Sequence, residues 1–563
     1  MAVSYASGTS DIPLIGMTIG EKFDEIVSCF GDREAVVCIH QNIRMTYKEL
    51  AARVNTVAKA LLALGLNKGD RIGVWSPNNV EWLISQYASA KCGAILVTIN
   101  PAYRVHELAY VLKQSGCKAL IIQNQFKTSD YEAMLAEICP GIAACQPGSL
   151  QEKEFPNLRT VITTTRSRHS GIYGWDELQG LASHVSDQAY AQRQVELDMD
   201  EAINIQYTSG TTGFPKGATL SHHNILNNAF FTAKIMKFTE ADRLIVPVPL
   251  YHCFGMVLAN LGCLTTGACL VYPSEAFEPE AVLQATEQER GTALFGVPTM
   301  FIAELALDSF RNYNLTSLRT GIMAGAPCPV ETMKQVIELM HMHEVEIGYG
   351  MTETSPLSFQ TRTDAPFQKR VTTVGSVHPH VEVKIIDDNT GKLCPLGVMG
   401  ELCTRGYSVM IGYWDNAKAT NSSIDKDGWM HSGDIAVMDE DGYVNIVGRI
   451  KDMIIRGGEN VYPKEIEEFL MTHDRVENVQ VTGVPDEKYG EEIIAWIKLT
   501  AGPALTDQDI KAFCKGKLAH YKVPRYYRFT EEFPMTVTGK IQKFKMREIS
   551  IGELGLKKPQ AKL

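Results

Sequence analysis

The segment of this sequence best suited to bind phosphate is a run of glycine and hydroxyl residues with one lysine near its end. It reads Tyr207-Thr-Ser-Gly-Thr-Thr-Gly-Phe-Pro-Lys-Gly217, and it follows a predicted strand and precedes a predicted helix. Its glycines let backbone amides turn inward and its hydroxyls and lysine add donors, so it could cradle a triphosphate. It is not a Walker A loop, because Lys216 stands between Pro215 and Gly217. Composition alone would leave a flexible loop as the simpler interpretation.

Five further motifs carry side chains that suit a nucleotide. Tyr349-Gly-Met-Thr-Glu353 offers an aromatic ring and a carboxylate, and Mg²⁺ prefers a carboxylate together with phosphate oxygens. Trp429-Met-His-Ser-Gly-Asp434 offers a carboxylate that can accept from two vicinal hydroxyls. The other three are Ala324-Gly-Ala-Pro327, Gly448-Arg-Ile-Lys-Asp452 and Pro534-Met-Thr-Val-Thr-Gly-Lys-Ile541. Each motif alone would be an ordinary turn, strand end or surface lysine.

Together and in this order, the motifs resemble those of the adenylate-forming superfamily, which includes acyl-CoA synthetases, peptide-synthetase adenylation domains and beetle luciferases. The resemblance covers roughly residues 30 to 550. It implies that ATP and Mg²⁺ activate a carboxylic acid as acyl-AMP, and that coenzyme A then accepts the acyl group. Runs such as PKGATLSHHNI and KDMIIRGGENVYP are most similar to the medium-chain group called acyl-CoA synthetase family member 2 and its bacterial relatives.

The resemblance also implies roles for single residues. Lys540 would bridge the attacking carboxylate and the α-phosphate, and Glu353 and Thr212 would hold the metal ion. The implied catalytic residues are Lys540, Lys216, Thr352, Glu353 and His252. The implied ATP and AMP contacts are Thr208, Ser209, Gly210, Thr211, Thr212, Gly213, Lys216, Gly325, Ala326, Pro327, Tyr349, Gly350, Met351, Thr352, Asp434, Arg449 and Lys540.

Two further sets concern the acceptor and the acid. The small C-terminal domain would rotate about a hinge at Lys451 and present a loop to coenzyme A, namely Arg456, Gly457, Gly458 and Glu459. In Pro249-Leu-Tyr-His-Cys-Phe-Gly255, His252 stands where amino-acid-activating relatives carry an aspartate, which disfavours an amino-acid substrate. The implied acyl pocket consists of His252, Phe254, Gly255, Met256, Gly325, Tyr349, Met351 and Ser355.

The elements that position these motifs alternate between short β-branched runs and amphipathic stretches. RIGVW (71 to 75) and AILVTIN (94 to 100) are typical of buried parallel strands, and residues 47 to 65 repeat apolar positions at helical spacing. The pattern predicts an α/β fold: a large N-terminal domain with two α/β subdomains and a β-rich subdomain, and a small mobile α+β C-terminal domain. We expect the adenylation domain to span residues 1–449 and the small domain residues 450–563.

Composition narrows the partners. A net charge of −11 disfavours nucleic acid as a binding partner. The sequence contains no apolar stretch of 18 residues, so we expect no membrane-spanning helix. None of the 13 cysteines forms a CxxC pair, so we expect reduced thiols and neither disulfides nor a zinc framework. We expect a cytoplasmic protein, with a peroxisomal alternative because the chain ends Ala561-Lys562-Leu563. The sequence leaves open whether the chain forms a homodimer.

Two other functions stay open at this stage. The acyl group could pass to a carrier-protein thiol or another acceptor, or the chain could be a catalytically silent nucleotide-binding protein.

Overall fold

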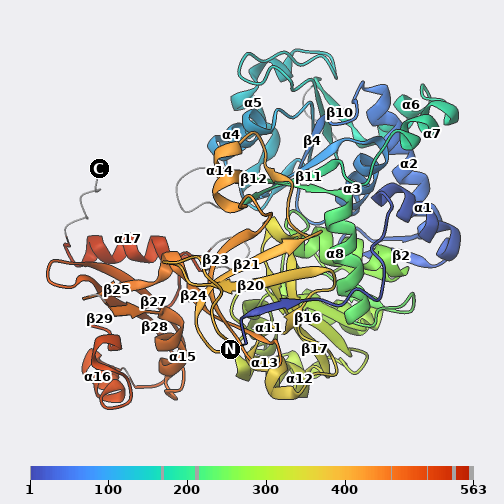
Figure 1. Cartoon of the computed structure of the whole chain (residues 1–563). Coiled ribbons are helices and arrows are strands. Elements are labelled where there is room, and N and C mark those ends of the chain that lie inside the picture. Colours follow the sequence, from blue (N-terminus) through green and yellow to red (C-terminus); the bar gives the residue numbers. More distant parts are fainter. Residues whose placement is uncertain are drawn as a thin grey trace. The chain divides into compact units, whose positions relative to one another are not determined.

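The computed structural model describes residues 2–165, 170–208, 215–457, 459–503, 505–535 and 541–556, and the chain divides into two compact units (Figure 1). The larger unit comprises Ser7–Glu382 and Thr404–Met430, and the smaller comprises Met1–Ala6, Val383–Cys403 and His431–Leu563. The domain boundary expected after residue 449 stays a prediction.

Two mixed sheets with mostly parallel inner strands form the frame of the larger unit. The first sheet has the order β10 (Ile172–Gly174), β9 (Thr160–Thr163), β6 (Ala119–Ile122), β4 (Arg71–Trp75), β5 (Ile95–Ile99), β11 (Ala202–Thr208), β12 (Lys216–Ser221), β22 (Gly412–Tyr413). The second has the order β19 (Ser376–Val377), β18 (Leu357–Gln360), β17 (Glu344–Gly350), β16 (Thr320–Ala324), β15 (Ala293–Gly296), β13 (Arg243–Ile245), β14 (Cys269–Tyr272), β2 (Glu34–Cys38), β3 (Ile43–Thr46). The predicted α/β class is confirmed.

Helices cover both faces of the first sheet, because successive side chains on its strands point to opposite sides. On β4, Ile72 and Val74 belong to the core with helices α2 and α3, whereas Trp75 belongs to the core with α4 and α5. The Trp75 ring stacks on Tyr131 of α5 at 3.7 Å between centroids. Figure 1 shows these helix pairs on opposite sides of the strands. Their bounds are α2 (Tyr47–Ala63), α3 (Val80–Cys92), α4 (Val105–Ser115) and α5 (Tyr131–Ile138).

The helix predicted after the phosphate-binding run is present as α8 (His222–Ile235). Strand β12 lies between the run and this helix. Strands β11 and β12 pair antiparallel, with Thr208 opposite Lys216. The run therefore connects two antiparallel strands, whereas a Walker loop leads from a strand directly into a helix.

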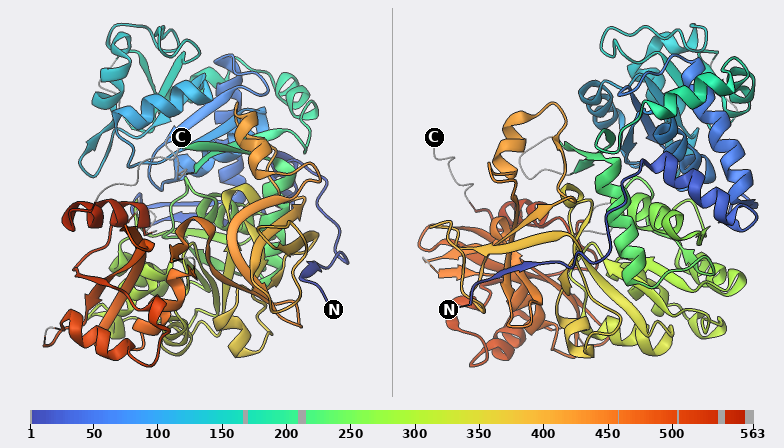
Figure 2. Two further views of the ribbon diagram at one scale, coloured as in Figure 1. Left: turned by 60° about the vertical axis from the view of Figure 1, so that its left-hand side comes forward. Right: turned by 45° about the vertical axis from the view of Figure 1, so that its right-hand side comes forward.

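The smaller unit contains the predicted β-rich and α+β parts. A five-stranded sheet has the order β1 (Tyr5–Ser7), β20 (Val381–Ile386), β21 (Gly400–Gly406), β23 (Met430–Met438), β24 (Val444–Arg449). Figure 2 shows the blue N-terminal strand β1 lying along this yellow and orange sheet.

A second sheet in the smaller unit carries the C-terminal helices. It contains β26 (Glu459–Val461), β25 (Ile454–Arg456), β28 (Gly490–Leu499), β27 (Val476–Asp486) and β29 (Tyr526–Phe529). One face packs on α15 (Pro463–Leu470) and α16 (Asp507–Cys514), and the other packs on α17 (Lys543–Glu553). The predicted small α+β fold is confirmed.

Candidate active site

The two ends of the phosphate-binding run lie on neighbouring strands of the first sheet. The Thr208 hydroxyl donates to the Lys216 carbonyl at 3.4 Å, which closes the hairpin. The predicted phosphate contacts between these ends, Ser209, Gly210, Thr211, Thr212 and Gly213, lie outside the described residues. What the structure shows is therefore the frame that holds the run.

Glu353 is a buried carboxylate next to this frame. Only 5 % of the residue is exposed, and its Oε1 accepts hydrogen bonds from the Tyr413 hydroxyl at 2.8 Å and the Thr208 hydroxyl at 3.3 Å. Its backbone carbonyl accepts from the Met410 N–H at 2.9 Å. Among the described residues, no cation forms an ion pair with it. The bonds orient the carboxylate.

Tyr413 joins the two nucleotide motifs and was missed by the sequence analysis. It lies on β22, which pairs with β12, and its hydroxyl contacts Glu353 while its ring lies 5.0 Å from the Lys216 ammonium. Such a distance permits a cation–π attraction. Burial and then the Glu353 charge raise the pKa of Tyr413, so the phenol stays protonated and can donate. The alternating strand pattern that gave the other strands could not identify a two-residue strand.

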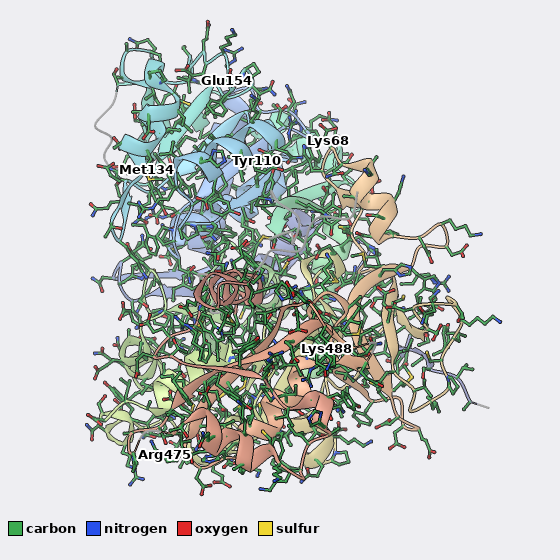
Figure 3. The ribbon with its side chains drawn as sticks, turned by 90° about the vertical axis from the view of Figure 1, so that its left-hand side faces the viewer. Lys68, Tyr110, Met134, Glu154, Arg475 and Lys488 are labelled. Carbon is green, nitrogen blue, oxygen red and sulfur yellow. The ribbon has the colours of Figure 1, made fainter. Side chains whose placement is uncertain are left out.

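Helix α4 anchors the run from outside. The Tyr110 hydroxyl, labelled in Figure 3, donates to the Pro215 carbonyl at 3.0 Å. The Gln114 side chain accepts from the Tyr207 hydroxyl and donates to the Trp414 carbonyl at 2.7 Å. One helix thus fixes residues on both sides of the run and next to Tyr413.

Two glycines in the nucleotide motifs cannot be replaced without strain. Gly325 follows β16 with φ +85°, in the left-handed region that favours glycine. A Cβ on Gly350 would lie 1.8 Å from the Pro356 carbonyl oxygen, because the chain after β17 turns back on itself. Tyr349 precedes this turn and its ring packs edge-on to Phe359 at 6.0 Å. Ala326 and Pro327 extend the loop after Gly325 at the surface.

His252 lies just before a π-helix, η3 (Phe254–Leu261), an element that often occurs at functional sites. The Phe254 N–H donates to His252 Nδ1 at 3.2 Å, so the neutral ring carries its proton on Nε2. A Cβ on Gly255 would lie 2.5 Å from the Pro249 carbonyl oxygen, so η3 packs against the backbone before it. These contacts fix the ring and its tautomer.

The remaining predicted pocket residues sit among buried sulfur and amide groups. The Gln206 amide donates to Met256 Sδ at 3.6 Å and accepts from the Cys253 thiol at 3.0 Å. Burial raises the pKa of Cys253 to about 12 although Thr352 hydrogen-bonds to it, so the thiol stays neutral. The Ser355 hydroxyl donates to the Ser408 carbonyl at 2.6 Å, which ties two loops together. The predicted acyl-contact role of these residues, with Phe254 and Met351, stays a prediction.

In the smaller unit, Asp434 and Arg449 lie opposite each other on β23 and β24. Arg449 Nε lies 2.8 Å from Asp434 Oδ1, and the aspartate is 4 % exposed. The Asp434 N–H donates to the Ser432 hydroxyl at 3.1 Å, which orients the turn before it. The pairing explains the 15-residue spacing between the two motifs: a hairpin brings their ends together.

The residues expected to serve coenzyme A lie around β25. The Arg456 guanidinium pairs with the buried Glu492 at 2.8 Å and donates to the His520 carbonyl at 3.2 Å. Gly457 has φ +62°, and its N–H donates to the Tyr489 carbonyl at 2.8 Å. Lys451 and Glu459 are exposed. Gly458 and the predicted catalytic Lys540 lie outside the described residues.

Comparison with known proteins agrees with this fold and these motifs. Residues 23–414 match the AMP-binding enzyme family, and residues 465–540 match the AMP-binding enzyme C-terminal domain. The chain therefore belongs to the AMP-binding enzymes, the adenylate-forming superfamily. Its homologues include acyl-CoA synthetases, and AMP-forming ligase activity is supported.

Particular relatives make the similarity more specific. YngI of Bacillus subtilis is 49% identical over 97% of this chain and 100% of its own length. The medium-chain acyl-CoA ligase ACSF2, mitochondrial, of Danio rerio is 44% identical over 99% of this chain and 92% of its own length. The ATP-bound crystal structure of MatB from Rhodopseudomonas palustris is 30% identical, with a TM-score of 0.81 over 96% of this chain and 100% of that chain.

The same comparisons bear on location. Among the described residues, none of the helices is long and apolar enough to cross a membrane. The relatives named ACSF2 are called mitochondrial, so the peroxisomal alternative is not supported. The terminal tripeptide on which that alternative depended lies outside the described residues. The 13 cysteines all lie among the described residues, and none of them forms a disulfide there.

Proposed function

We propose that this chain is a medium-chain acyl-CoA ligase that forms an acyl-adenylate from MgATP and then a thioester with coenzyme A. In the first half-reaction the acid's carboxylate oxygen attacks the α-phosphorus of ATP and pyrophosphate leaves. In the second half-reaction the thiolate of coenzyme A attacks the acyl carbon and AMP leaves. Reactions at phosphorus need positioning and charge stabilisation more than a nucleophile from the protein.

The observation that carries the proposal is the environment of Glu353. This carboxylate is 5 % exposed, is held at one oxygen by two neutral hydroxyls, and lies next to the phosphate hairpin. A hard oxygen donor of this kind fits Mg²⁺, which binds proteins through one or two carboxylates and keeps phosphate oxygens and waters as its other ligands. When bound, Mg²⁺ would neutralise charge on the phosphates. Glu353 would hold it, with Thr212 as the second predicted ligand.

The protein's own groups divide the remaining tasks. Lys216, held over the Tyr413 ring, places a positive charge beside the hairpin that binds the phosphates. Asp434 would accept hydrogen bonds from the ribose hydroxyls, with Arg449 as a second sugar or phosphate contact. His252 would present Nε2–H to the acid, because its Nδ1 already accepts from the Phe254 N–H. Lys540 would bridge the carboxylate and the α-phosphate, and rotation about Lys451 would separate the two half-reactions.

The choice of acid and acceptor has two supports. Relatives 44% identical over nearly the whole chain are named medium-chain acyl-CoA ligases. The π-helix that carries Phe254 and Met256 is completely buried and apolar apart from one asparagine, which suits an aliphatic chain. The preferred chain length is part of the test.

The test measures each half-reaction separately. Straight-chain acids of increasing length and aromatic acids are supplied with ATP and Mg²⁺, with and without coenzyme A, and products are identified by mass. We expect pyrophosphate release to depend on the acid, and a thioester to form best with medium chains. Acyl-AMP without thioester would move the acceptor to a carrier-protein thiol. Replacement K540A should abolish pyrophosphate release, and unchanged release would overturn its assignment.

A further inference from the structure

Three different metal-ligating side chains meet in the five-stranded sheet of the smaller unit. Glu401 and Cys403 are two positions apart on β21, so they share one face of the strand, and His431 lies on the neighbouring strand β23. A carboxylate oxygen, the thiol sulfur and a ring nitrogen lie within 4.8 Å of one another. Cys403 is fully buried and Glu401 is 9% exposed. His431 belongs to the Trp429–Asp434 motif, in which Asp434 is the predicted nucleotide contact.

The geometry of the cluster differs from that of a proton relay. His431 Nδ1 lies 2.8 Å from Glu401 Oε2 and 3.7 Å from Cys403 Sγ. In a relay the base and the orienting carboxylate contact opposite ring nitrogens, but here both neighbours face the same one. That nitrogen can share at most one proton with them. A single positive centre between the three atoms would satisfy all of them at once.

We propose that Glu401, Cys403 and His431 form a binding site for a Zn²⁺-like divalent cation. Zn²⁺ takes thiolate, imidazole and carboxylate ligands at about 2.0–2.3 Å. Tetrahedral bonds of that length separate neighbouring ligand atoms by about 3.3–3.8 Å. The sulfur–nitrogen distance already has this value, and the nitrogen–oxygen distance needs to open by about half an ångström. Water would complete the coordination from the His431 side, where the side chain is 31% exposed.

The surroundings hold the ligands in place. Glu401 Oε1 accepts from the Gly433 N–H at 3.1 Å, which fixes the carboxylate and leaves Oε2 toward the other two ligands. Asp388 is close enough to act electrostatically on Glu401 and His431 and adds negative potential. Burial raises the pKa of the Cys403 thiol, against the lowering effects of His431 and Lys384, so the thiol gives up its proton when the metal binds. Zinc would replace the proton shared by His431 and Glu401 and fix the turn that leads to Asp434.

The alternative is that the cluster is only a hydrogen-bonded support for this turn. Cobalt(II) distinguishes the two, because a tetrahedral Co²⁺–thiolate site gives a sulfur-to-metal charge-transfer band. The full chain, stripped with a chelator, is titrated with Co²⁺ and then with Zn²⁺. We expect one Co²⁺ per chain with this band, and displacement by Zn²⁺. The proposed site would be overturned if no such band appears, or if Zn²⁺ does not displace the bound Co²⁺.

Matched variants assign the ligands. C403S and H431Q should each lower Co²⁺ affinity at least about 100-fold, since even outer-shell losses cost 10- to 100-fold. C394S is the control, because Cys394 is buried in the same unit and donates to the Met399 carbonyl. It should keep the band. Thermal unfolding without metal shows that each variant is folded, and C403A replaces C403S if it is not. A band that persists without Cys403 and vanishes without Cys394 would refute the assignment.

Discussion

Two carboxylates expected to touch the nucleotide have different kinds of partner: one has neutral hydrogen-bond donors and the other has a positively charged arginine. Glu353, in the larger unit, receives two neutral hydroxyl donors at Oε1. Asp434, in the smaller unit, has the Arg449 guanidinium 2.8 Å away. Both residues are about equally buried, at 5% and 4% exposed. The difference therefore lies in charge compensation and not in access to solvent.

This difference separates what each group can bind. A buried carboxylate held only by neutral donors has no cation paired with it, so a bound metal ion would be its counter-charge. A carboxylate already paired with arginine is close to neutral as a unit, and its remaining lone pairs suit uncharged hydroxyls. We infer that the chain divides nucleotide recognition between a metal-binding carboxylate and a sugar-binding one.

The largest effect is expected from E353Q. The amide keeps the shape of the side chain but removes the charge, so acid-dependent pyrophosphate release should fall about 100- to 1,000-fold. More Mg²⁺ should restore part of the rate. The control is E331Q, which removes the same charge from an exposed pair with Lys334 at 3.3 Å and should change the rate little. If the rate of E353Q depends on Mg²⁺ concentration as that of the unmodified chain does, Glu353 is not the metal-binding carboxylate.

The substitution D434N tests whether Asp434 binds the ribose of ATP. The amide cannot accept equally well at both atoms, so KM for ATP should rise about 10- to 100-fold, the value of a hydrogen bond or two to a charged acceptor. The Mg²⁺ dependence should stay that of the unmodified chain. Steady-state pyrophosphate release against ATP concentration measures both.

A ligand change provides the control for D434N. The unmodified chain should bind 3′-deoxy-ATP much more weakly than ATP, because the hydrogen bond of the 3′-hydroxyl is lost. D434N should bind the two nucleotides about equally, because it has already lost that hydrogen bond. Additive losses would mean that Asp434 acts elsewhere than on the sugar. Thermal unfolding checks that loss of the ion pair with Arg449 has not destabilised the smaller unit.

A smaller effect is expected from Y413F. It removes one neutral donor from Glu353 but keeps the ring beside Lys216, so the Mg²⁺ concentration for half-maximal rate should rise about 2- to 10-fold, the value of one hydrogen bond. Y413L, which also removes the ring, should add a loss in ATP affinity. If Y413F and Y413L behave alike, the ring contact with Lys216 contributes nothing.

Tyr413 also shows where sequence analysis reaches its limit. Strands such as RIGVW at β4 were predicted to the residue, because alternation and β-branching determine them locally. Tyr413 acts through a strand of two residues, paired with β12 from almost 200 positions away. No local pattern encodes such a pair. The sequence analysis likewise gave the α4 anchors Tyr110 and Gln114 no role at the site.

Cys403 gives the same lesson. Sequence spacing rules look for metal ligands two to four residues apart or in helical repeats, and on that basis the cysteines indicated no zinc site. A sheet places Glu401 and Cys403 on one face and adds His431 from the neighbouring strand. The ligands are therefore set by strand pairing, which spacing along the chain does not show.

A third buried carboxylate extends the comparison, because it has neither a hydroxyl frame nor an adjacent arginine pair. Glu346 on β17 is completely buried and accepts from the Gln360 amide. Burial raises its pKa to about 8, and the Gln360 hydrogen bond and the charge of Arg370 only partly oppose that rise. At neutral pH the folded chain therefore keeps this group protonated, whereas the unfolded chain ionises it near its ordinary value of 4.5.

The sign of the pH dependence follows from this difference. Because the folded state holds the proton more tightly, the contribution of Glu346 to stability falls as pH rises from about 4.5 to about 8 and is constant above that range. E346Q mimics the protonated acid at every pH. Its Tm should nearly equal that of the unmodified chain at pH 5 and exceed it by a growing margin up to pH 8. Parallel Tm curves would mean that Glu346 is ionised when folded, and that a buried carboxylate here needs no cation to keep its charge.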